Sequence, residues 1–157
     1  MLTIELCGTV GDCYVAVCGC PEAREDHAVA MAQFSRECIE DMKSLVENEM
    51  PEMNMSSLRL RVGIHSGSVT GGMLRGDRSR FQLFGDTMNL AARMESTGEP
   101  NKAQMSAATA KLLRESGKLH WVKAREDIVE VKGKEEMATY WLQPAAVLSS
   151  ICSSELT

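Results

Sequence analysis

The 157-residue sequence is poor in aromatic residues, which make up 4% of it, and its formal net charge of −5 leaves no excess of basic residues. Nucleic-acid binding by charge and base stacking needs both features, so the composition argues against that class. No apolar run reaches the roughly 20 residues of a membrane-spanning helix. The first residues also lack the basic and then apolar segments of a secretory signal. We therefore expect no nucleic-acid or membrane contact by this segment, and a cytoplasmic location.

Two common site signatures are also missing. The six cysteines include no pair with Cys-x-x-Cys spacing, so reduced, partly buried thiols explain them and a zinc site has little support. Gly67, Gly71 and Gly72 are not followed by the Gly-Lys-Ser/Thr sequence of a Walker loop. Their expected role is to permit tight turns. What remains is an ordinary globular composition, with 44% hydrophobic and 25% charged residues, and enough length for one domain with a core.

The apolar pattern predicts a mixture of strands and helices. Strands over 2–10 and 13–18 flank Gly11-Asp12, which is typical of a two-residue hairpin. A long amphipathic helix is expected over 24–46 and an alternating strand over 58–64. The further expected elements are a turn over 66–72, strands over 80–84, 103–106, 120–124, 128–131 and 139–142, and a helix over 107–115.

This order of elements favours an α+β sandwich over residues 1–143, followed by a flexible tail over 144–157. The sequence shows no internal repeat and no domain linker.

The segment from Phe84 to Gly98 reads as a strand end, a tight turn and a short capped helix. Thr87 or Asp86 can cap its N-terminus, and Gly98 fits just past its C-terminus. Within the helix Asn89 and Arg93 are four residues apart, so their side chains share one face. No carboxylate lies four residues from Arg93 on either side. An amide and a guanidinium so placed are donors suited to an anion such as a polyphosphate.

Four motifs together resemble the class III nucleotidyl cyclases. They are Val10-Gly11-Asp12-Cys13-Tyr14, Arg61-Val62-Gly63-Ile64-His65-Ser66-Gly67, the segment 84–98, and Val131-Lys132-Gly133-Lys134 followed by Thr139-Tyr140-Trp141. They occur in the family's order from about residue 6 to residue 142, and their amino-acid sequences are most similar to those of the guanylate cyclase branch. The resemblance implies a ferredoxin-like βαββαβ sandwich that works as a homodimer or heterodimer with active sites at the subunit interface.

The resemblance also implies a reaction. These enzymes convert GTP or ATP to the 3′,5′-cyclic nucleotide and pyrophosphate, and the ribose 3′-hydroxyl attacks the α-phosphate in line. Two Mg²⁺ or Mn²⁺ ions held by two aspartates assist. Such phosphoryl chemistry depends on positioning and charge neutralisation more than on covalent catalysis.

Residue roles follow from the same resemblance. Asp12 matches the second metal aspartate, Asn89 the residue that orients the ribose, Arg93 the arginine that stabilises the transition-state phosphate, and Lys132 a lysine that contacts the triphosphate. The alternative for Asp12 is an ordinary turn aspartate. For the helix that carries Arg93 it is a solvated surface face, and for Lys132 it is a solvated basic turn. Glu135 stands where the family usually has glycine, which puts a negative charge near the proposed triphosphate contact.

Two positions that read the purine depart from both branches. Gly8 stands where guanylate cyclases have glutamate and adenylate cyclases have lysine, and it offers no side chain to a base edge. Gln82 stands where the branches have cysteine, or aspartate or threonine, and its amide can both donate and accept. The choice between GTP and ATP therefore cannot be read from these positions.

The family's first strand, which carries the first metal aspartate, and its helical crossover are not found in residues 1–157. We therefore expect a domain truncated at the N-terminus, with poor metal binding and no activity alone. Three hypotheses stay open: part of a cyclase catalytic domain, a non-catalytic partner half, and a degenerate nucleotide-binding or dimerisation module. Full-length relatives are often attached to membranes or receptors, with this domain on the cytosolic side.

Overall fold

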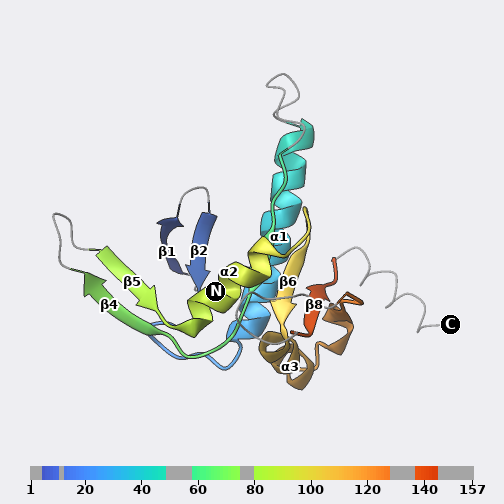
Figure 1. The fold of residues 1–157 in the computed structure, drawn as a ribbon. Helices are drawn as coiled ribbons and strands as arrows, with labels where there is room; N and C mark the ends of the chain where they lie inside the picture. The colour runs from blue at the N-terminus through green and yellow to red at the C-terminus, as the bar shows by residue number, and fades with distance from the viewer. Residues whose placement is uncertain (1–4, 11–12, 49–57, 75–79, 128–136, 145–157) are drawn as a thin grey trace.

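The computed structural model describes residues 5–10, 13–48, 58–74, 80–127 and 137–144. Within them a four-stranded sheet has the order β3 (Val62–Ile64), β6 (Ala103–Ser106), β8 (Thr139–Leu142), β7 (Val122–Ala124). β3 runs parallel to β6, whereas β8 is antiparallel to both of its neighbours. Figure 1 shows α1 (His27–Asn48) beside this sheet, with α3 (Ala107–Glu115) near its lower end.

Two antiparallel hairpins complete the described strands. In the first, β1 (Glu5–Val10) pairs with β2 (Cys13–Val17), and Val10 lies opposite Cys13. In the second, β4 (Thr70–Leu74) pairs with β5 (Arg80–Phe84). β1 also contacts β5, so the two hairpins lie next to each other, to the left of α1 in Figure 1.

The core lies between the helices and the four-stranded sheet. Small residues on α1 allow close packing, and the buried set comprises Ala28, Ala32, Ile39, Ile64, Ala103, Met105, Ala110, Leu113, Trp121 and Leu142. Met105 and Leu113 are completely buried, and burying a side chain of that size contributes about 1.5–3 kcal/mol. Ser106 begins α3 as its N-cap, with its side chain accepting a hydrogen bond from Thr109 N. Among the described residues no helix has the length and apolarity needed to cross a bilayer.

The third helix, α2 (Asp86–Ser96), packs on β3 at a residue without a side chain. A Cβ atom at Gly63 would lie 2.1 Å from Glu95 N and 2.4 Å from Ala91 O. Real Cβ atoms do not approach backbone atoms so closely, so only glycine at position 63 permits this packing. The distance between α2 and the sheet is therefore set by the absence of a Cβ.

Several predicted elements are confirmed residue for residue: strands 80–84, 103–106 and 139–142 and helix 107–115. The predicted pairing of the first two strands is also confirmed, over Glu5–Val10 and Cys13–Val17, while the Gly11-Asp12 turn lies outside the described residues. A long helix is confirmed as well, and it spans His27–Asn48 rather than 24–46. The predicted strand over 58–64 is shorter and covers Val62–Ile64. The predicted strand over 128–131 and the tail after 144 lie outside the described residues.

Three local predictions were wrong. The turn expected over 66–72 ends earlier, because Thr70 already begins β4 and the pairing with β5 outweighs the low strand propensity of Gly71 and Gly72. The strand expected over 120–124 begins only at Val122, after a 3₁₀ turn over Leu119–Trp121. Helix α2 is capped by the backbone of Gly85, without a side-chain cap.

Candidate functional site

Helix α2 presents Asn89 and Arg93 on the side turned away from the sheet. Ala91 and Glu95 lie against Gly63, and Met94 is completely buried. Asn89 and Arg93 each lie two residues from Ala91, which is about 200° around the helix axis at 100° per residue. Both therefore lie on the side of the helix opposite Ala91. Asn89 is exposed and Arg93 is half-buried. The predicted common face is therefore present, and it is an outer face of the domain.

Neither side chain is engaged within the described part of the chain. The hydrogen bonds and ion pairs found there include none from the Asn89 amide or the Arg93 guanidinium. The nearby carboxylate of Glu95 is paired instead with Arg61, with Nε and Oε1 2.9 Å apart. Asn89 and Arg93 thus keep their donors available to a ligand or a partner.

The beginning of α2 is held by the loop that follows β3. Gly85 has φ 129°, a conformation that L side chains rarely adopt, and this lets β5 pass directly into α2. The hydroxyl of Thr87 donates to Ser68 O at 2.6 Å rather than capping the helix. A Cβ at Gly67 would lie 2.6 Å from Thr87 Oγ1. This loop therefore fits closely against the first turn of the helix.

The end of α2 is held by a partly buried polar network that the sequence interpretation missed. Thr97 caps the helix, and its N and Oγ1 both donate to Arg93 O, at 3.1 and 2.7 Å. Arg125 Nη1 donates to Thr97 O and to Gln104 Oε1, both at 2.8 Å. Gln104 Nε2 donates in turn to Thr97 Oγ1 at 3.0 Å. A polar residue inside the apolar strand 103–106 was the available signal, because a buried amide needs partners.

A second polar network, made mainly of hydroxyl groups, joins the ends of β3 and β6. His65 Nδ1 lies 2.7 Å from Ser106 Oγ, and Ser66 Oγ lies 3.0 Å from Thr109 Oγ1. Ser106 and Thr109 belong to the start of α3 and are buried. This geometry indicates a structural role for His65.

The two positions matched to purine recognition lie on strands that contact each other. Gln82 is exposed in β5, opposite Gly72 of β4. Gly8 lies in β1, opposite Val15, just after an irregularity in the register. β1 contacts β5, and β5 continues through Gly85 into the helix that carries Asn89.

Asp12 and Lys132 lie outside the described residues, as does Glu135. Their predicted roles in metal and triphosphate binding therefore stay predictions. In the described part of the chain no cluster of three His, Cys, Asp or Glu side chains could hold a metal ion. Asp12, a hard oxygen ligand, remains the proposed residue for Mg²⁺ or Mn²⁺.

Comparison with known proteins identifies the family to which this domain belongs. The model of the adenylate and guanylate cyclase catalytic domain matches residues 3–144. The chain is 42% identical over 137 residues to the receptor-type guanylate cyclase gcy-28 of Caenorhabditis elegans, covering 86% of this chain and 10% of that protein. It is 37% identical over 134 residues to the guanylate cyclase soluble subunit beta-2 of Rattus norvegicus, covering 85% of this chain and 19% of that protein.

Solved structures agree with these sequence matches. The guanylate cyclase domain of RhGC from Catenaria anguillulae, solved in complex with GTP, superposes with a TM-score of 0.70 at 30% identity, covering 90% of this chain and 72% of that chain. The adenylyl cyclase CyaB from P. aeruginosa shares the fold, with a TM-score of 0.73 at 24% identity over the same fractions. The chain belongs to the adenylate and guanylate cyclase catalytic domain family, and the expected cyclase fold is confirmed. It spans a tenth to a fifth of these curated relatives.

Proposed function

We propose that the chain supplies the nucleotide-positioning face of a cyclase that makes cyclic GMP or cyclic AMP. The observation that carries this proposal is the outer face of α2, where the side chains of Asn89 and Arg93 are unengaged while both ends of the helix are tied down. A positioned cationic donor stabilises charge that develops in a transition state, because it needs no reorganisation during the reaction. The domain would act on the cytosolic side of any membrane to which a longer protein is attached.

In the proposed reaction the ribose 3′-oxygen forms a bond to the α-phosphorus, and the bond from that phosphorus to the bridging oxygen of the β-phosphate breaks. Pyrophosphate leaves, and the hydroxyl proton passes to solvent. Asn89 would hold the ribose, Arg93 the α-phosphate oxygens, and Lys132 the departing phosphates. Asp12, with a second aspartate from outside residues 1–157, would hold Mg²⁺ or Mn²⁺, which when bound neutralise the triphosphate charge.

A second cyclase domain is the proposed partner. Its role would be to face the outer side of α2 and complete the site, as a homodimer or heterodimer. Large apolar side chains on the two hairpins support this arrangement, because Tyr14, Met73 and Phe84 are 75%, 61% and 41% exposed. Large apolar groups that are left in water favour an interaction surface. The alternative, a non-catalytic partner half, uses the same face and differs only in which chain holds the metal.

Cyclase activity tests the proposal directly. The chain is assayed with Mn²⁺ and with GTP or ATP, alone and mixed with a cyclase domain that carries both metal aspartates. Product from the mixture but not from the chain alone supports the partner-half alternative. Product from the chain alone supports a catalytic domain, and the favoured nucleotide identifies the purine. No product from either would leave a nucleotide-binding or dimerisation module and refute the proposed synthesis.

In whichever preparation is active, Arg93→Ala should lower turnover by on the order of 10²-fold, as does the loss of an oxyanion donor elsewhere. Lys111→Ala is the control, because Lys111 lies on α3, is 75% exposed and pairs only loosely with Glu115 at 3.8 Å. Turnover of the Arg93 variant within a few-fold of the parent would contradict the role of Arg93.

A further inference from the structure

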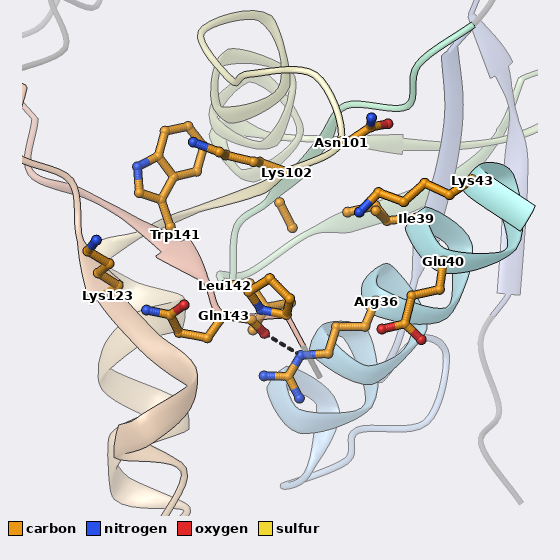
Figure 2. A pocket seen from close by; sticks show the side chains of 12 residues that line it. Arg36, Ile39, Glu40, Lys43, Asn101, Lys102, Lys123, Trp141, Leu142 and Gln143 are labelled. Carbon is orange, nitrogen blue, oxygen red and sulfur yellow. Dashed lines mark hydrogen bonds between the residues drawn. The ribbon is translucent and has the colours of Figure 1, made fainter. Parts of the chain in front are cut away.

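A pocket of about 220 Å³ opens between α1 and the strands β6, β7 and β8 (Figure 2). Its apolar lining residues are Ile39, Ala103, Trp141, Leu142 and Pro144. None of its lining residues belongs to α2. It is therefore separate from the outer face on which Asn89 and Arg93 lie.

The charges around this pocket are strongly one-sided. Arg36 and Lys43 reach into it from α1, and Lys102 and Lys123 approach from the opposite wall, whereas Glu40 is the single carboxylate among the lining residues (Figure 2). The whole chain, by contrast, carries a net charge of −5. A concentration of positive charge in an acidic protein creates a local potential that attracts anions.

Two of these cations have no carboxylate partner among the described residues, since the ion pairs found there include neither Lys43 nor Lys123. Lys102 is paired with Glu99 at 2.6 Å, and its Nζ lies 5.0 Å from the centre of the Trp141 ring. The pocket thus combines two unpaired ammonium groups with a third that is held over an aromatic face.

Arg36 is the fixed cation of the group. Its Nε donates to Gln143 O at 2.8 Å, and its guanidinium carbon lies 4.0 Å from the centre of the Trp121 ring. Its Nη2 is buried without a hydrogen-bond partner among the described residues. Burial lowers the pKa of Arg36, and the nearby Glu40 opposes that shift. An anion seated beside this guanidinium would offset the cost of its desolvation.

The size and the donor types indicate the ligand class. A volume of about 220 Å³ is smaller than the roughly 300–1,000 Å³ of sites for drug-sized molecules, so the ligand must be compact. Lysines act on phosphate as movable point charges, and several of them together suit a group with more than one negative charge. We propose that this pocket binds a compact phosphate-bearing anion, at a site distinct from the nucleotide site proposed on α2.

Tryptophan fluorescence offers a direct assay, because the two tryptophans of the chain lie against Arg36 and Lys102 of this pocket. Inorganic phosphate and pyrophosphate are titrated at constant ionic strength, with citrate as a polyanion without phosphorus. We expect saturable binding of the phosphates and weaker binding of citrate. No saturable signal, or citrate binding as tightly as pyrophosphate, would overturn the proposal.

Charge variants then locate the bound anion. Lys43→Glu combined with Lys123→Glu should weaken pyrophosphate binding by about tenfold or more, because two attractive charges become repulsive. Glu40→Gln should tighten binding several-fold, a gain that misfolding cannot produce. Lys111→Glu on α3 is the control: it makes the charge change of one of these two substitutions and should leave the affinity within about twofold.

Lys132→Ala combined with Arg93→Ala separates this site from the proposed nucleotide site, because these are the residues proposed to hold its phosphates, and binding to the pocket should survive in that variant. Loss of binding there, or equal weakening by Lys111→Glu, would assign the anion to another site or to general surface charge and refute the pocket. The result does not depend on whether the chain has cyclase activity.

Discussion

At the scale of single residues, Gly63 matters for what it lacks. Helix α2 lies so close to β3 that backbone atoms of Ala91 and Glu95 occupy the space of a Cβ at position 63. The same contact directs positions 89 and 93 outward. One missing methyl group therefore decides both the depth of the helix and the direction of its functional side chains.

We predict that Gly63→Ala destabilises the domain by about 1–3 kcal/mol, because the overpacked helix must move. The change is measured as a lower midpoint of urea unfolding. Gly72→Ala is the matched control, since its new Cβ would meet only Phe84 Cε2 at an ordinary 3.8 Å. Equal effects of the two substitutions would mean that the close approach at Gly63 is not a constraint.

At the scale of elements, the end of α2 is joined to β6 and to the segment after β7 by hydrogen bonds that share atoms. Arg125 and Gln104 each bond Thr97 and also bond each other. Gln104 is completely buried, so its amide has no access to water as a substitute partner. The three residues should therefore act as one unit.

Arg125→Met should cost about 1–3 kcal/mol, because it leaves buried acceptors unpaired. Gln104→Leu should cost a similar amount, and the double variant should cost less than the two single losses together, with a coupling of about 0.5–3 kcal/mol. A urea-unfolding double-mutant cycle measures this coupling. Additive losses would show that the two side chains stabilise α2 independently.

The sequence predicted elements best where local signals agree. Strand 103–106 and helix 107–115 were delimited correctly because an apolar run meets a serine that caps the following helix. β4 was missed because Gly71 and Gly72 resemble a turn, and only the pairing with β5 makes them a strand. The bond between Gln104 and Arg125 joins residues 21 positions apart, which no local pattern encodes.

The site itself was predicted from helical spacing and from motif resemblance. Asn89 and Arg93 were matched as a pair on one helix face, and the structure places them on an outer face. That this face points outward follows from Gly63, a contact between segments distant in the sequence. The roles of Asp12 and Lys132 stay predictions from the family resemblance.

At the scale of the whole molecule, stability should be uneven. β6 lies between β3 and β8 and contributes completely buried side chains, whereas the hairpin of β4 and β5 exposes Met73 and Phe84. A two-stranded hairpin is marginally stable without packing. Exposed, sparsely packed elements open at lower free energy than the core.

Hydrogen exchange should therefore be at least about tenfold faster in β4 and β5 than in β6. Amide exchange followed by mass spectrometry or NMR measures the difference. Addition of a cyclase domain that pairs with the chain should slow exchange in the hairpin and leave β6 unchanged. Protection of the hairpin equal to that of β6 in the isolated chain would contradict this expectation.

Gly85 has a mechanical consequence. It is the single residue between the end of β5 at Phe84 and the start of α2 at Asp86, so no loop absorbs a tilt of the hairpin. The helix is clamped at its middle by Gly63 and at its end by Thr97. The first turn is bound as well, through the Thr87 hydroxyl and Ser68 O. The hairpin and the helix therefore form one stiff unit, and a partner that binds the hairpin finds Asn89 and Arg93 already in position.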